Sequence, residues 1–465
     1  MGIEETVFIA FILFSICFII YQIAKGEWSE SVPGVMWFCL MTLPFAVQWP
    51  YFVAGPRETQ AVGIMITGAA LMLGDFIKIR RTNAKTVLLD NGVNENTLIN
   101  RLMNNYIVYA ALFGAIALYH LAHISEVPLL EKYIYHADLS TLKEMRENSS
   151  KLLDVPLVFK YMFTWATGII APLGFLLMLK RKLYLRAFLF IILALLYARI
   201  TMALLPGLYM LFTVCFAAAL EWRPGISKKI IIPLAVIIAL FLVKAGLFLA
   251  AGPYSLFRYQ ADPARFTAFS DGDPRNTSTI PDNFRLVPQD KLSFVEKNIN
   301  YVVYRFFLVP AEVSGKWYQF YPEIGGGYTG FRDLSPGGRG QGFVHPSNAV
   351  GRWAYEQKHP QMYLASVNAY ASVDADAHAR MGMPGVLLAG LVLLGLRLSI
   401  KKIRVNSLIG RSLYSIVVVQ LALLPVQASL PAILVAQGML LVLLLMAAHY
   451  ITTVRLAKPA EMIAN

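Results

Sequence analysis

The sequence predicts an all-α polytopic membrane protein, with about eleven transmembrane helices and one large external loop that contains amphipathic helices. Apolar residues make up 57% of the 465 residues and charged residues only 15%. With a mean hydropathy of +0.56, this balance is too hydrophobic for an ordinary soluble domain. Uninterrupted apolar segments of about 20 residues also recur along the chain, and a helix of that length crosses the hydrocarbon core of a bilayer.

A long polar segment divides the predicted spans into two groups. Before it, the predicted spans are Thr6–Ala24, Gly34–Ala54, Gln60–Phe76, Asn104–Leu121, Val158–Leu179, Ala187–Ala203, Leu208–Glu221 and Ile230–Ala251. After it, they are Met383–Leu398, Leu413–Val426 and Leu430–Ala448. We therefore expect a membrane part at 1–251 with a shorter loop at 122–156, a large loop at 252–382, and further spans with a tail at 383–465. Because Met1-Gly-Ile-Glu-Glu lacks the basic region of a cleaved signal peptide, we expect the first span to be retained.

Basic clusters between the predicted spans set the expected orientation, since short loops rich in Lys and Arg stay in the cytoplasm. The clusters that fall on one side are Lys78-Ile-Arg-Arg81, Lys180-Arg-Lys182, Lys228-Lys229 and Lys401-Lys-Ile-Arg404. This places the N-terminus and the two longer loops outside, and the C-terminus in the cytoplasm. The formal charge of +13 is largely explained by these clusters, so it does not indicate a nucleic-acid partner. Cysteine gives no metal-ligand spacing, because Cys17, Cys39 and Cys215 lie apart in apolar segments.

Arginines and aromatic residues alternate through the external loops. The arginines are Arg146, Arg258, Arg265, Arg275, Arg285, Arg305, Arg332, Arg339, Arg352 and Arg380. Their planar, permanently charged groups suit phosphate and pyrophosphate. Aromatic rings such as those of Tyr304 and Tyr318 stack on sugars or anchor loops at the membrane interface. The combination favours a site for a glycan attached to a phosphate.

Two segments outside the spans have helical patterns. Apolar residues recur at helical spacing through Asn298–Tyr321, where Pro310 should produce a kink. Such a helix would lie on the outer leaflet, with Trp317, Tyr318 and Tyr321 at the interface. The segment Asp138–Arg146 is either a short surface helix or a solvated connector.

Several ionisable residues are candidates for chemistry. Arg199 and Lys244 lie within predicted spans, where a charge marks a cavity or reaches the headgroups from a helix end. Asp374 and His378 share one face of a helix, where they could form a metal pair or an acid–base pair. Alternatively, the carboxylates of this segment are salt-bridged structural groups.

The loop also contains histidines and glycine-rich runs. His345 and His359 titrate near neutrality and could deprotonate a sugar hydroxyl. The runs Gly325–Gly327 and Gly337–Gly340 lack the residues of a phosphate loop and are expected to be flexible turns that hinge over a substrate.

Two stretches of the large loop resemble the Wzy-type polymerases of oligosaccharide repeat units. The first is Tyr304-Arg-Phe-Phe-Leu-Val-Pro-Ala311 followed by Trp317-Tyr-Gln-Phe-Tyr321, and the second follows Asn368 and runs from Asp374 through Gly382 and Gly385 to Leu388. The number of spans, and the shorter loop with its expected helix ending at Arg146, are also similar to that family. The resemblance implies an architecture like that of GT-C membrane glycosyltransferases.

The resemblance implies an inverting glycosyl transfer at the periplasmic face of the bacterial inner membrane. A glycan on undecaprenyl diphosphate would be the donor, and a new lipid-linked repeat unit the acceptor, without a metal or other cofactor. A chain-length-regulating co-polymerase is a possible partner. Arginines would hold the diphosphate and an acidic or histidine side chain would take the proton. The candidate diphosphate and glycan ligands are Arg305, Arg146, Arg258, Arg199, Arg332, Arg380, Tyr304 and Tyr318, and the candidate bases are Glu312, His345 and Asp374.

Other activities remain open on the sequence. An O-antigen ligase shares the donor and the architecture but uses lipid A core as its acceptor. A polyprenyl-phosphate-sugar transferase should carry a carboxylate in its first external loop, and this loop is short here, with only Arg57 and Glu58. A glycolipid flippase or other transporter should show internal repeats and polar residues within its spans.

Overall fold

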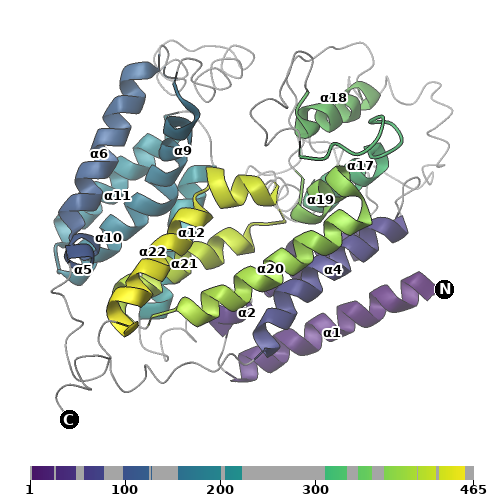
Figure 1. Ribbon diagram of the computed structural model, residues 1–465, viewed down its shortest axis with the longest axis horizontal. Helices are drawn as coiled ribbons and strands as arrows, with labels where there is room; N and C mark the ends of the chain where they lie inside the picture. Colours follow the sequence, from purple (N-terminus) through teal and green to yellow (C-terminus); the bar gives the residue numbers. More distant parts are fainter. Residues whose placement is uncertain are drawn as a thin grey trace, which may run out of the picture. The chain divides into compact units, whose positions relative to one another are not determined.

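The computed structural model describes residues 3–25, 28–48, 57–77, 98–124, 127, 155–200, 205–221, 309–331, 344–358, 371–405, 407–425 and 429–455. Every regular element within these ranges is a helix, which confirms the predicted all-α class (Figure 1). Each predicted span except Ile230–Ala251 overlaps a described helix, and that segment lies outside the described residues.

Four of the described helical stretches are long and apolar enough to cross a membrane. They are Glu5–Gln22, Tyr106–His123, Phe159–Lys180 and Met383–Ile403. Shorter apolar helices cover Tyr184–Ala198, Leu408–Ala422 and Met439–Thr453. Since about 20 residues span the hydrocarbon core, these four stretches indicate a helical membrane protein.

The chain forms two compact units, each made of segments that are distant in the sequence. One unit contains Met1–Phe76, Lys229–Gly395 and Ala422–Leu430. The other contains Ile77–Lys228, Leu396–Leu421 and Pro431–Asn465. The two units therefore do not coincide with the expected division of the sequence into residues 1–251, 252–382 and 383–465.

The first unit contains the helices that position the candidate site. They are α1 (Ile3–Lys25), α2 (Trp28–Trp37), the π-helical turn η1 (Phe38–Thr42), α3 (Leu43–Gln48), α4 (Arg57–Phe76), α17 (Val309–Phe320), α18 (Pro346–Lys358), α19 (Val373–Met381) and the first turns of α20 (Met383–Ile403).

Within this unit, α4 packs against α1, α2, α17 and α19, and in Figure 1 it runs beside α20. Small residues make these close approaches possible: a Cβ on Gly68 would lie 2.9 Å from the ring of Trp37, and one on Gly390 would lie 3.1 Å from Ile66. Gln60 of α4 donates a 2.9 Å hydrogen bond to the carbonyl of Ala311 in α17.

The second unit is a helical bundle. Its elements are α5 (Leu98–Met103), α6 (Tyr106–His123), α9 (Leu157–Trp165), η3 (Ala166–Ile170), α10 (Ala171–Lys180), α11 (Tyr184–Arg199), α12 (Leu205–Glu221), the remainder of α20, α21 (Leu408–Ala422), η7 (Ala432–Ala436), α22 (Met439–Tyr450) and η8 (Ile451–Arg455).

The helix α10 packs against α6, α11 and α12 within this bundle. Gly174 lets Phe190 and Tyr109 approach, since a Cβ there would lie 3.0 Å from the ring of Phe190 and 3.2 Å from the Cβ of Tyr109. A polar pair is buried in the bundle, where Nδ1 of His120 and the hydroxyl of Tyr197 lie 2.8 Å apart. In a membrane bundle such pairing avoids the cost of unsatisfied polar groups.

Candidate functional site

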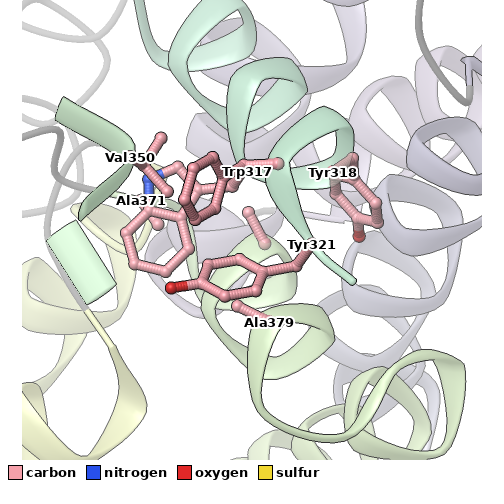
Figure 2. Close-up of a cluster of buried hydrophobic side chains, with 8 residues drawn as sticks. Trp317, Tyr318, Tyr321, Val350, Ala371 and Ala379 are labelled. Carbon is pink, nitrogen blue, oxygen red and sulfur yellow. The ribbon is translucent and has the colours of Figure 1, made fainter. Parts of the chain in front are cut away.

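The candidate site is built on α19, in which ionisable residues alternate with alanine from Asp374 to Arg380. Both kinds of residue are buried, because the small alanines let neighbouring helices approach. Ala371, Ala375 and Ala379 recur every fourth residue and pack against Trp317, Tyr318, Phe320, Tyr321 and Val350. Figure 2 shows this cluster, with Trp317 and Tyr318 projecting from different sides of α17.

This packing corrects the interface position predicted for the aromatic residues of α17. Trp317, Tyr318 and Tyr321 are only 2%, 2% and 4% exposed, so they pack inside the protein. The described helix α17 begins at Val309, and the kink predicted at Pro310 involves residues that lie partly outside the described ranges.

Asp374 lies in the first turn of α19 and has no exposed surface. Its Oδ2 accepts a 3.2 Å hydrogen bond from the hydroxyl of Tyr318, and its Oδ1 accepts one from Ser372. The Ser372 hydroxyl lies 3.1 Å from that of Ser314 in α17. Because a serine hydroxyl has one hydrogen, Ser314 must donate to Ser372 when Ser372 donates to an ionised Asp374. The hydrogen bonds from Ser314 through Ser372, and from Tyr318, therefore converge on the two oxygens of Asp374.

Burial raises the pKa of Asp374 from 3.8 to about 6. The hydrogen bonds from Ser372, from Tyr318 and from the backbone N–H groups of Asp374 and Ala375 act in the opposite direction, since they stabilise the charged form. Burial, followed by the charge of Asp374, raises the pKa of Tyr318 well above its usual value, so this tyrosine remains a donor. The result is a carboxyl group that changes its charge close to neutral pH.

A glycine on α4 makes room for the pair formed by Tyr318 and Asp374. A Cβ on Gly63 would lie 1.9 Å from the Tyr318 hydroxyl and 3.3 Å from Oδ2 of Asp374. Heavy atoms do not approach so closely, and any side chain at this position would displace the pair. The sequence analysis did not select Gly63, because no local pattern links it to residues more than 250 positions away.

His378 lies one helical turn after Asp374 and stacks on the ring of Tyr318, with a centroid distance of 4.4 Å. The ring of Tyr328 meets it edge-on at 5.9 Å. Burial lowers the pKa of His378 from 6.5 to about 4, so the imidazole is neutral at pH 7. Its Nδ1 is buried without a hydrogen-bond partner. The predicted shared face of Asp374 and His378 is therefore confirmed, with Tyr318 in contact with both.

Asp376 and Arg380 form a second i,i+4 pair on α19. The Nε of Arg380 donates to Oδ2 of Asp376 at 2.8 Å, and Nη2 donates to Oδ1 at 3.3 Å. The Nη1 donates to the carbonyl of Gly330 at 3.1 Å. The predicted salt-bridged role of the carboxylates is confirmed for Asp376. Arg380, expected as a diphosphate ligand, is instead buried and engaged with groups of the protein in this structure.

The other predicted residues are distributed over several elements. Glu312 is half-buried on α17, and His345 precedes α18, where its Nδ1 lies 2.8 Å from the hydroxyl of Ser347. Arg199 ends α11, in the other unit. The predicted residues that lie outside the described ranges are Arg146, Arg258, Tyr304, Arg305 and Arg332.

Sequence reasoning missed Ser314 and Ser372, and it selected Tyr318 as a glycan ligand and not as a hydrogen-bond partner of Asp374. Ser314 and Tyr318 are spaced i,i+4 on α17, so the sequence already placed both hydroxyl groups on one face of that helix. Ser372 directly precedes α19 and was also visible. Within the described residues, no three His, Cys, Asp or Glu side chains lie close enough together to hold a metal ion.

Together, the described residues form a buried, hydrogen-bonded cluster of ionisable side chains on α19, the short helix that directly precedes α20, which is long enough to span a membrane. Comparisons with family models, curated proteins and solved structures found no match to this chain.

Proposed function

We propose that this chain is a membrane glycosyltransferase that polymerises undecaprenyl-diphosphate-linked oligosaccharide repeat units at the periplasmic face of the bacterial inner membrane. The observation that carries the proposal is Asp374, a buried carboxyl group with a pKa of about 6 located nine residues before the spanning helix α20. A general base works best when its pKa is close to the working pH. A base at a membrane boundary suits a substrate whose lipid remains in the bilayer.

The arrangement of the two resembling stretches supports the same function. The Trp317–Tyr321 stretch lies on α17 or directly after it, and the second stretch includes α19. These helices pack against each other, and the hydrogen bond between Tyr318 and Asp374 joins residues 56 positions apart. Residues that carry the resemblance to Wzy-type polymerases therefore meet at the proposed base.

In the proposed reaction, a hydroxyl oxygen of the acceptor sugar attacks the anomeric carbon of the donor glycan. The bond from that carbon to the diphosphate oxygen breaks, and undecaprenyl diphosphate leaves with the electron pair. Asp374 takes the hydroxyl proton, while Ser372 and Tyr318 hold its two oxygens. Arg305, Arg258 and Arg332, which belong to the same unit as Asp374, are proposed to stabilise the diphosphate.

The proposal includes a conformational change at the base. Asp374 has no exposed surface in the described conformation, so α4, whose Gly63 faces Tyr318 and Asp374, must move away from α17 and α19 for the acceptor to reach it. We assign Arg380 a structural role, because its guanidinium group holds Asp376 and Gly330.

The test is a polymerisation assay with the purified full chain in liposomes, given only the lipid-linked repeat unit of its host. The wild-type protein should produce a ladder of longer glycans. Asp374→Asn should slow this by about 10²–10⁴-fold, the usual contribution of a general base. Glu323→Gln removes an exposed carboxylate on a nearby turn and should not change the rate.

Each other outcome contradicts a defined part of the proposal. No ladder from well-folded wild-type protein would contradict polymerisation, and a product formed only after adding lipid A core would identify a ligase. Full activity of Asp374→Asn together with loss of activity in Glu312→Gln or His345→Gln would move the base to one of those residues.

A further inference from the structure

The turn Pro322–Phe331, which follows α17, displays apolar side chains on its surface. Ile324, Tyr328 and Phe331 are 50%, 49% and 48% exposed. Met381, at the end of α19, is 40% exposed. Exposed apolar groups gathered in one place mark an interaction surface in many proteins.

The backbone of this turn is held in a defined shape. The carbonyl of Phe320 accepts hydrogen bonds from the N–H groups of Ile324 and Gly325, at 3.0 Å and 2.9 Å. Gly326 and Gly327 have φ values of 70° and 114°, a conformation that suits glycine. The sequence analysis expected a flexible hinge here, whereas the structure shows a hydrogen-bonded turn.

The turn is tied to the end of α19, directly before α20. The N–H of Thr329 donates to Ala379 at 2.9 Å, and that of Gly330 donates to Arg380 at 3.0 Å. The Tyr328 hydroxyl would lie 2.7 Å from a Cβ on Gly382, whose φ of 67° also favours glycine. The exposed side chains are therefore attached at the point where the spanning helix begins.

From this arrangement we propose that the turn Pro322–Phe331 inserts Ile324, Tyr328 and Phe331 into the interface of the bilayer that α20 crosses. The lipid surface is the occupant that the structure favours, because the turn is tied to the residues directly before α20, a helix that is long and apolar enough to span a membrane and that also exposes apolar side chains. Leu387, Leu388 and Leu391 are 53%, 47% and 66% exposed within the first turns of that helix.

The chemistry of the side chains agrees with this position. Tyrosine is enriched at membrane interfaces, where its ring contacts the lipid and its hydroxyl remains near polar groups. The buried pair of Asp376 and Arg380 anchors the turn, since Arg380 holds the carbonyl of Gly330. The charged residue of the turn is Glu323, which is exposed. The inference is independent of the proposed glycosyl transfer.

The test measures the depth of the turn in a membrane. The full chain, with Cys17, Cys39 and Cys215 replaced by alanine, would carry one new cysteine labelled with the fluorophore NBD. Ile324→Cys and Phe331→Cys are the test positions. Leu391→Cys on α20 is the reference for lipid, and Glu323→Cys on the same turn is the reference for water. Each protein is reconstituted into liposomes of phosphatidylethanolamine and phosphatidylglycerol.

The labels at Ile324 and Phe331 should emit at shorter wavelength than the label at Glu323. Doxyl-labelled lipids should quench them as they quench the label at Leu391, and aqueous iodide should not. Quenching by iodide, as at Glu323, would overturn the proposal. A blue-shifted emission that doxyl lipid does not quench would also overturn it, because a protein surface would then cover the turn. Neither result depends on whether polymer is formed.

Discussion

Removing the hydroxyl of Tyr318 should raise the pH at which the proposed base becomes active. In Tyr318→Phe, the carboxylate of Asp374 loses one of the hydrogen bonds that stabilise its charged form. A hydrogen bond to a charged group contributes about 1.5–3 kcal/mol, and one pKa unit corresponds to about 1.4 kcal/mol. The pKa should therefore rise by about 1–2 units from its value of about 6.

The effect on rate follows from the fraction of ionised base. At pH 7 that fraction should fall from about nine-tenths to between about one-tenth and one-half. The polymerisation rate in liposomes, measured across pH with the lipid-linked repeat unit limiting, should show its acid limb displaced upwards, with a nearly unchanged maximum at high pH.

Tyr321→Phe is the matched control, because Tyr321 is buried in the same cluster as Tyr318, but the carboxylate that acts on its pKa is Asp376 and not Asp374. Burial, followed by the charge of Asp376, raises the pKa of Tyr321 to about 12, so its phenol is neutral throughout the assay. The control should keep the acid limb of the wild type. An acid limb that is the same in Tyr318→Phe and in wild type would refute the assignment of Asp374 as the base.

Three further predictions concern the stability of the site. Because the pKa of Asp374 is raised, this residue contributes its full stability below pH 4, and the contribution is lost as pH rises through about 6. Because the pKa of His378 is lowered, this residue contributes its full stability above pH 6.5, and the contribution is lost as pH falls through about 4. Each contribution is about 3 kcal/mol, and in the wild type the two nearly cancel. The free energy of unfolding of Asp374→Asn should therefore rise between pH 4 and 6.5, and that of His378→Gln should fall. Equal slopes in the two variants would contradict both pKa shifts. Gly63→Ala should cost about 1–3 kcal/mol by overpacking against Tyr318, measured by thermal unfolding, while Gly114→Ala, with no atom within 4 Å of the new Cβ, should change little. Asp376→Asn should cost about 3–5 kcal/mol by leaving Arg380 uncompensated, and the double change with Arg380→Met should recover much of this loss in a double-mutant cycle; additive losses would argue against the pair.

The sequence was a good guide where structure depends on local patterns. Long apolar segments predicted the helices, because a bilayer demands backbone hydrogen bonds within each segment. The i,i+4 spacing of Asp374 and His378 placed them on one face of α19, and the same spacing joins Asp376 to Arg380. The Arg380 pairing could have been predicted, but the positive charge of this residue suggested a substrate ligand instead.

The sequence was a poor guide where contacts join distant segments. Tyr318 looked like an interface residue because aromatic composition alone does not distinguish burial in protein from burial in lipid. Its hydrogen bond to Asp374 depends on how α17 packs on α19, and the space for both depends on Gly63 of α4. The alanines at 371, 375 and 379 were the sequence signal that another helix packs closely there.

The most direct test of the central claim is the length of the surface glycan in cells whose only copy of this protein carries Asp374→Asn. We predict that these cells display glycan with a single repeat unit, while cells with Glu323→Gln display chains of normal length. Chains of normal length in the Asp374→Asn cells, with the protein present at wild-type amount, would contradict the role of this carboxyl group in glycan polymerisation.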